Sequence, residues 1–210
     1  MAPATLDLIS QALDPEREHP GDATSERILD AALALAAASG VQKLTMDEIA
    51  TRAGVGRMTV YRRFGDKDRL VESLAVREGR RCIAELDAIS DPAAPIEDQV
   101  AAGFAASLRL AREHPLLNRL ARVEPETVLA ALTENGGALF ALAREFVAER
   151  LRASQSAGIP GPIDADEAAE LLVRLAFSFV LIQESVLPLD DADRAREVAR
   201  RLIAPVLAGA

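Results

Sequence analysis

The sequence is poor in the residues from which β-sheets, disulfide networks and metal sites are most often built. Among 210 residues it has one cysteine, two histidines, one tyrosine and no tryptophan, and aromatic residues make up 3%. A single cysteine excludes an intramolecular disulfide and a multi-cysteine metal site, and it suits a reducing compartment. Neither His19 nor His114 has a second histidine or a cysteine at metal-ligand spacing.

The usual signatures of catalysis are also missing. Cys82 is better explained as a small residue on a helix face than as a nucleophile. Acidic residues cluster at 164–167 and 190–193, where helices are expected to begin and where the helix N-terminus favours a carboxylate. The sequence has no glycine-rich phosphate loop. We therefore expect no enzymatic activity and no cofactor.

No apolar run is long enough for a membrane span. The longest, Leu171 to Ile182, is too short to cross a bilayer and contains Arg174. Residues 1–22 lack the basic segment followed by an apolar run that marks a secretory signal. We expect a cytoplasmic protein with no membrane partner.

Half of the residues are hydrophobic, and alanine, leucine, arginine and glutamate dominate. This composition is typical of helices and provides for a substantial core, so it predicts an all-α fold. Residues 1–23, which contain three prolines, are expected to form a flexible extension. The following residues divide into a domain of short helices at 24–70 and a helical domain at 71–210.

Helical periodicity and helix-end residues place the elements along the chain. In the first domain, Thr24 or Ser25 caps a helix that ends at Gly40, Thr45 caps a second that stops at Gly54, and a fourth helix starts at Asp66. The helices predicted for the second domain are 96–113, 116–122, 126–133, 138–153, 164–185 and 191–207, the last with a kink before Pro205, and the breaks include 135–137 and 154–162.

Charge is distributed unevenly. The net charge is −9, which argues against a polyanionic partner for the molecule as a whole. Residues 43–69, however, have seven basic and four acidic side chains, whereas residues 81–210 have thirteen arginines against twenty acidic residues. A locally positive segment on an acidic protein is consistent with DNA binding by one face alone.

Within the positive segment the spacing predicts a helix-turn-helix. Gly54 supplies the turn between two short helices, and the small Ala50 lets them pack closely. In the third helix, about residues 56–64, Val60 and Phe64 point inward. Met58, Thr59, Tyr61 and Arg62 then point outward, with Arg57 and Arg63 on the flanks. A major groove admits such a helix, although the same arginines can also simply solvate a surface.

Residues 28–74, especially LTMDEIATRAGVGRMTVYRRFGDKDRLVESL, resemble the N-terminal DNA-binding domain of the tetracycline-repressor (TetR) family. The resemblance implies that Thr45, Tyr61 and Lys67 contact phosphates of double-stranded DNA. It also implies that Arg57, Met58, Thr59 and Arg62 face bases or the nearby backbone. Met58 departs from the small residue often found at that position.

The same resemblance implies a homodimer that pairs through its last two long helices and encloses a small-molecule pocket in each subunit. Pocket candidates are Phe104, Leu108, Phe140 and Phe177. The helix at 164–185 is apolar on nearly every side, which fits either a dimer interface or a central position in a monomer. Interface candidates are Leu172, Arg174, Leu175 and Phe179, and Arg174 needs either an acidic partner across the interface or an anionic ligand.

These features predict a sequence-specific DNA-binding regulator. The leading hypothesis is a dimeric repressor that binds a near-palindromic operator and is released by an unidentified small molecule. Ligand-assisted binding or activation remains an alternative within the same class. From another class, the chain can be an all-helical small-molecule carrier or interaction module with a vestigial DNA-binding head.

Overall fold

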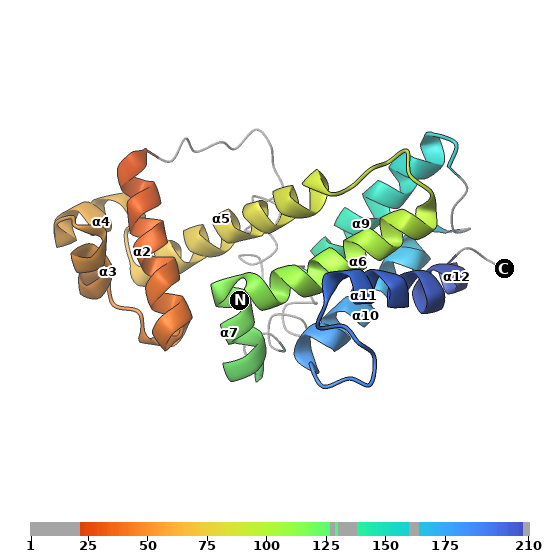
Figure 1. Ribbon diagram of the computed structural model, residues 1–210. Coiled ribbons are helices and arrows are strands. Elements are labelled where there is room, and N and C mark those ends of the chain that lie inside the picture. The colour runs from red at the N-terminus through yellow and green to blue at the C-terminus, as the bar shows by residue number, and fades with distance from the viewer. Residues whose placement is uncertain (1–21, 127–128, 130–137, 160–163, 208–210) are drawn as a thin grey trace.

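The computed structural model describes residues 22–126, 129, 138–159 and 164–207. These residues form helices joined by short loops, with no β-strand in the described part, and the all-α prediction is confirmed. Figure 1 shows the helices of residues 23–64 at one end, a long helix α5 (Lys67–Ala88) leading away from them, and most of the remaining helices at the other end. We call residues 22–74 the head and the described part of 96–207 the body.

The head contains α2 (Ala23–Ser39), a 3-10 turn η1 (Val41–Lys43), α3 (Met46–Ala53), α4 (Arg57–Phe64) and the first turns of α5. Its helices bury one continuous apolar core, to which α7 (Pro115–Val123) adds a residue from outside the head. The core consists of Ile28, Leu29, Ala31, Ala32, Ala36, Leu44, Met46, Ile49, Ala50, Val60, Leu70, Leu74 and Leu116. The boundary predicted at residue 70 falls within α5, and Leu74 still packs in this core.

Only one of the two predicted ends of α2 matches the observed helix. Gly40 ends the helix, as expected, with φ of 97°. The cap at its start is neither Thr24 nor Ser25, since the Asp22 carboxylate accepts hydrogen bonds from both of their backbone N–H groups at 3.0 and 2.9 Å. An aspartate is as good a cap as a hydroxyl residue, and here it lies two residues before Thr24 and three before Ser25.

The body is arranged around α6 (Ile96–Glu113), which packs against α10 (Ala165–Leu181), α11 (Ala192–Val198) and the π-helical turn η3 (Ala199–Ile203). A further helix, α9 (Ala138–Ser156), packs along α10. The body core is rich in alanine, with Phe104, Leu108, Leu151, Leu172 and Ile203 among its larger members. Small side chains let these helices approach closely.

Two predicted helices of the body differ from the observed ones. The helix expected over 164–185 ends at Leu181, where Ile182 adopts an extended backbone with φ of −111°. Beyond it the Ser185 hydroxyl accepts a hydrogen bond from the Leu187 N–H, and Leu189 is buried in the body core. The helix expected over 191–207 begins at Ala192 and passes through η3 into α12 (Ala204–Leu207). At that junction the Ala204 N–H bonds to the Ala199 carbonyl, a π-type spacing next to Pro205, which has no N–H of its own.

Other predicted elements lie outside the described residues, wholly or in part. These are the extension at 1–23 apart from its last two residues, most of the helix at 126–133, the break at 135–137 and part of the loop at 154–162. The described start of that loop is helical, because α9 continues to Ser156 rather than stopping near residue 153.

Candidate DNA-binding site

The turn between α3 and α4 has the geometry of a helix-turn-helix. Gly54 adopts φ of 65°, in the left-handed region that favours glycine, and its N–H bonds back to the Ala50 and Thr51 carbonyls. The next amide, that of Val55, also bonds to the Ala50 carbonyl, at 3.0 Å. These bonds end α3 and direct the chain into α4, which starts after Gly56.

Thr45 lies where a helix cap was expected, at the start of α3. Its hydroxyl accepts a hydrogen bond from the Glu48 N–H at 3.3 Å and donates one to the Glu48 carboxylate at 2.6 Å. The hydroxyl therefore orders the first turn of α3. A role toward a phosphate would require it to exchange the carboxylate for that phosphate.

One face of α4 is buried and the opposite face is open. Val60 is completely buried, and Phe64 is half-buried against the head core. On the other side Met58 is 77% exposed and Arg62 is exposed. Thr59 and Tyr61, predicted to point outward, are only half-exposed, and Tyr61 packs against the head core.

Arg57 joins α3 to α4. Its guanidinium contacts both carboxylate oxygens of Asp47 at 3.0 Å, donates to the Tyr61 hydroxyl at 3.3 Å, and lies 5.3 Å from the Tyr61 ring centroid. The hydrogen bond with Tyr61, followed by the charge of Asp47, raises the pKa of Arg57. Arg57 thus holds the two helices in register, and it must leave Asp47 before it can contact a base.

Two other cations of this region also hold helices together. Arg63 pairs with Asp22 and donates to the Ser25 hydroxyl at 3.0 Å, which fastens α4 to the start of α2. The Ser25 backbone N–H and the Arg63 side chain both lower the pKa of Asp22, the amide more strongly. The ammonium of Lys67 donates to the Gln42 carbonyl at 2.7 Å, which ties the start of α5 to η1.

Arg62 differs from these cations. Within the described residues it makes no side-chain hydrogen bond or ion pair, and the same holds for the exposed Lys43 and Arg52. An exposed arginine with five free donors on a helix that follows a tight turn can bind phosphates or the acceptor edge of guanine. Arg62 is therefore the cation of α4 best placed to meet DNA.

The predicted pocket residues fall into two groups. Phe104 and Leu108 lie on α6 in the body core, only 4% and 2% exposed. Phe140 and Phe177 are half-buried and form a separate pair between α9 and α10, with ring centroids 6.4 Å apart. A ligand that contacts all four of these residues would have to lie between α6, α9 and α10.

The predicted interface residues also divide. Leu172 belongs to the body core, and Phe179 packs edge-on against Phe104 with centroids 5.8 Å apart, so both are used within the subunit. Arg174 and Leu175 are exposed. Leu175 shares one open face of α10 with Leu171 and with Ile182 just beyond the helix, which are 38%, 48% and 66% exposed.

The expectation that Arg174 needs a partner outside its own subunit is wrong. Arg174 is 65% exposed and donates to Glu170, one turn earlier on α10, at 2.7 Å. Its guanidinium also lies 4.8 Å from the Phe140 ring centroid. Because the arginine is solvated and paired within its own helix, neither a partner across an interface nor an anionic ligand is needed to balance its charge.

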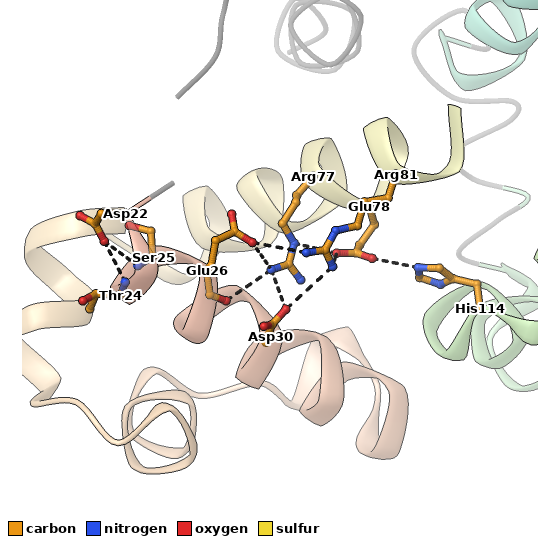
Figure 2. A network of polar contacts seen from close by, with 9 residues as sticks. All are labelled: Asp22, Thr24, Ser25, Glu26, Asp30, Arg77, Glu78, Arg81 and His114. Carbon is orange, nitrogen blue, oxygen red and sulfur yellow. Dashed lines mark hydrogen bonds and ion pairs between the residues drawn. The ribbon is translucent and has the colours of Figure 1, made fainter. Parts of the chain in front are cut away.

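A polar network that the sequence did not predict connects the head to the body (Figure 2). At its centre is Glu78 of α5, a buried carboxylate 5% exposed, which accepts hydrogen bonds from Arg77 at 2.7 Å and Arg81 at 3.3 Å. Arg77 reaches α2, where it contacts Glu26 at 3.1 Å and Asp30 at 2.8 Å. We call these residues, together with His114, the joint.

His114, between α6 and α7, completes the joint from the body side. Its Nδ1 accepts a hydrogen bond from the Leu117 N–H at 3.3 Å, so the ring proton lies on Nε2 and is donated to Glu78 at 2.9 Å. In the sequence His114 marks only a helix end before proline. Its partner is 36 residues away, and no local spacing indicates such a pair.

The described residues contain no cluster of three or more potential metal ligands. None of the described helices combines the length and hydrophobicity needed to cross a bilayer.

Two short helices joined by a tight glycine turn, the second with an open face, are characteristic of the helix-turn-helix class of DNA-binding proteins. Family models agree with this geometry. Residues 28–74 match the model described as bacterial regulatory proteins, tetR family, and residues 96–205 match the one described as bacterial tetracyclin repressor, C-terminal domain. The chain belongs to the tetracycline-repressor family and is a helix-turn-helix transcriptional regulator.

Proteins similar to this chain support the same family assignment. An uncharacterized HTH-type transcriptional regulator of Mycobacterium bovis is 29% identical over 182 residues, covering 85% of this chain and 92% of its own length. The HTH-type transcriptional regulator SrpR of Pseudomonas putida is 43% identical over 68 residues, which are 32% of this chain and 31% of SrpR. The crystal structure of the repressor AlkX from Dietzia is 26% identical with a TM-score of 0.57, covering 86% of this chain and 95% of AlkX.

Proposed function

We propose that the protein is a homodimeric repressor that binds a near-palindromic operator and leaves it when a small molecule enters the body. The observation that carries the proposal is the open face of α4, where Arg62 is exposed and unpaired while the neighbouring arginines are tied to the head. A repressor needs a rigid recognition helix with free donors, and these ties make α4 rigid.

The residues divide into contacts to bases and contacts to phosphates. We assign Met58 and Arg62 to base edges, since both are exposed on the open face of α4 and the Arg62 side chain makes no hydrogen bond or ion pair within the described residues. Thr45, Tyr61 and Lys67 are assigned to phosphates, because their polar atoms already lie at helix ends or make hydrogen bonds that a phosphate can replace. Arg57 and Thr59 lie beside the bases, Arg57 with the additional task of holding α3.

The exposed face of α10 supports the dimer. Leu171, Leu175 and Ile182 lie on one side of the element, and contiguous exposed apolar residues of this kind mark protein interfaces. A second copy of the chain is the occupant typical of the family. Two heads held at a fixed distance then bind two half-sites about one helical turn, ~34–36 Å, or a multiple of it, apart.

The joint provides a route from ligand to head. A ligand beside Phe104 and Leu108 contacts α6, and α6 ends at His114, which bonds to Glu78. Arg77, adjacent to Glu78, holds α2. A shift of α6 is therefore passed to the head by hydrogen bonds, and it changes operator affinity if it changes the distance between the two heads.

The proposal is tested with duplex DNA from the region upstream of the protein's own coding sequence. Fluorescence anisotropy should show selective binding over a scrambled duplex of equal length, and affinity should fall steeply with added salt. A compound panel is then screened for release of the bound duplex. Absence of any salt-sensitive, sequence-selective binding contradicts the regulator, whereas binding that every active compound strengthens contradicts ligand release and supports ligand-assisted binding.

A further inference from the structure

The most exposed large apolar side chain of the head lies on its recognition helix. Met58 is 77% exposed and occupies the second position of α4, two residues after Gly56 and one turn before Arg62. The apolar side chains of the head core, to which Met58 does not belong, are all buried or half-buried, Val60 and Phe64 of the same helix included. Leaving a thioether in water at this position brings no benefit to the folded head.

The surroundings of Met58 indicate a contact with a base rather than with a phosphate. A thioether has no hydrogen to donate, so it contributes nothing to phosphate binding. The first residues of a recognition helix are the ones that approach base edges in the major groove. The apolar group that the major groove displays is the C5-methyl of thymine, and methionine is flexible enough to pack against it.

We propose that Met58 is a specificity-determining residue that packs against a thymine methyl in each operator half-site. This inference rests on the proposed function, since it requires α4 to enter the major groove. Arg62 follows four residues later on the same face, a rise of about 6 Å along the helix axis. Successive base pairs are spaced ~3.4 Å apart, so the thymine lies within about two base pairs of the guanine that Arg62 contacts.

The test removes one methyl group at a time. An operator is first selected from random duplexes, and each thymine in it is then replaced by deoxyuridine, which lacks only the C5-methyl. For the natural protein, replacing one thymine at the symmetric position of both half-sites should weaken binding about fourfold per half-site. This is the factor expected from the loss of one buried methyl group. The Met58→Ala variant should bind the unmodified operator more weakly and lose its sensitivity to that replacement.

A matched variant separates this contact from the binding of α4 as a whole. Arg62→Ala should weaken binding yet keep the fourfold sensitivity to deoxyuridine. Met58 makes no core contact, so thermal unfolding of Met58→Ala should match that of the natural protein. The role of Met58 is overturned if selective binding depends on no thymine methyl, or if Met58→Ala keeps the sensitivity to deoxyuridine. Either result leaves the proposed regulatory function intact. Failure to select any operator overturns both.

Discussion

The head and the body expose different chemistry. In the head, the aliphatic residues are buried, and the open surface of α4 is one arginine and one methionine beside paired charges. In the body, α10 leaves Leu171, Leu175 and the adjacent Ile182 in the open. A polyanion suits the first surface and an apolar partner suits the second. The two surfaces thus suit different kinds of partner, and each can be altered without the other.

The largest effect is expected from the body face. Leu171→Glu combined with Leu175→Glu should convert the dimer to a monomer, because four carboxylates would then meet at the interface. Operator affinity should fall by about two to four orders of magnitude, the usual gain from linking two binding units. Sedimentation velocity and anisotropy measure the two effects. Val123→Glu, at a site 58% exposed outside this face, is the control and should change neither. A double variant that remains dimeric refutes the interface.

Stability should distinguish the head core from the exposed apolar sites. Leu70 is completely buried where α5 joins the head, so Leu70→Ala should lower the free energy of unfolding by about 2–5 kcal/mol. Ile89→Ala, at a site 41% exposed, should cost about 0.5 kcal/mol or less. Urea denaturation followed by circular dichroism measures both. Equal losses at the two sites would mean that the head core does not stabilise the fold as described.

The thiol of Cys82, on α5 close to the joint, should react slowly. Burial, and secondarily the charges of Glu78 and Glu85, raise its pKa from 9.0 to about 11. At neutral pH it then holds about one hundredth of the thiolate of an ordinary cysteine, and its rate should rise about tenfold per pH unit up to about pH 11. Alkylation of the folded protein is compared with alkylation in urea. Equal rates below pH 9 would show that Cys82 is not shielded.

Within α4, the unpaired Arg62 should matter more for specificity than a cation that is held by hydrogen bonds at a helix end. Arg62→Ala should weaken operator binding by about 1–3 kcal/mol and relax base preference at one position of each half-site. Competition binding with single-base variants of the operator measures this. Arg194→Ala, an exposed arginine on α11 of the body, removes the same charge and should leave base preference unchanged. Unaltered preference in Arg62→Ala would remove Arg62 from base recognition.

The smallest effect is expected for Lys67. Lys67→Ala removes the proposed phosphate contact and the bond to the Gln42 carbonyl, so it should weaken binding to all DNA sequences alike. The slope of log affinity against log salt should become shallower by about one unit. Titrations at four salt concentrations give this slope. A change in base preference in place of a change in slope would assign Lys67 to base recognition.

The head was more predictable from its sequence than the body because its signals are local. Thr45, Gly54 and Gly56 mark helix ends within a few residues of where they act, and the observed bounds of α3 and α4 follow them. In the body, the apolar run through Ile182 favoured a longer helix. The helix ends instead at Leu181, and the chain beyond it buries Leu189 in the body core, which is a property of packing and not of periodicity.

In neither region could contacts between residues from different elements be predicted from the sequence. No spacing shows that Arg57 is engaged by Asp47, or that Glu78 lies between Arg77 and His114. Arg174 shows the converse, because its position in an apolar run predicted an external partner while Glu170, one turn earlier, was already available. Charge counts identified the positive segment, and only the structure separates the paired arginines of α4 from the unpaired Arg62.

The central claim is that two copies of the head, held by the body, recognise two half-sites of one operator. Selection of binding sites from a random duplex library by the full-length protein tests it most directly. We predict enriched near-palindromes whose half-sites are about one helical turn, ~34–36 Å, or a multiple of it, apart. Recovery of no common sequence, or of a single unrepeated half-site, would contradict the claim.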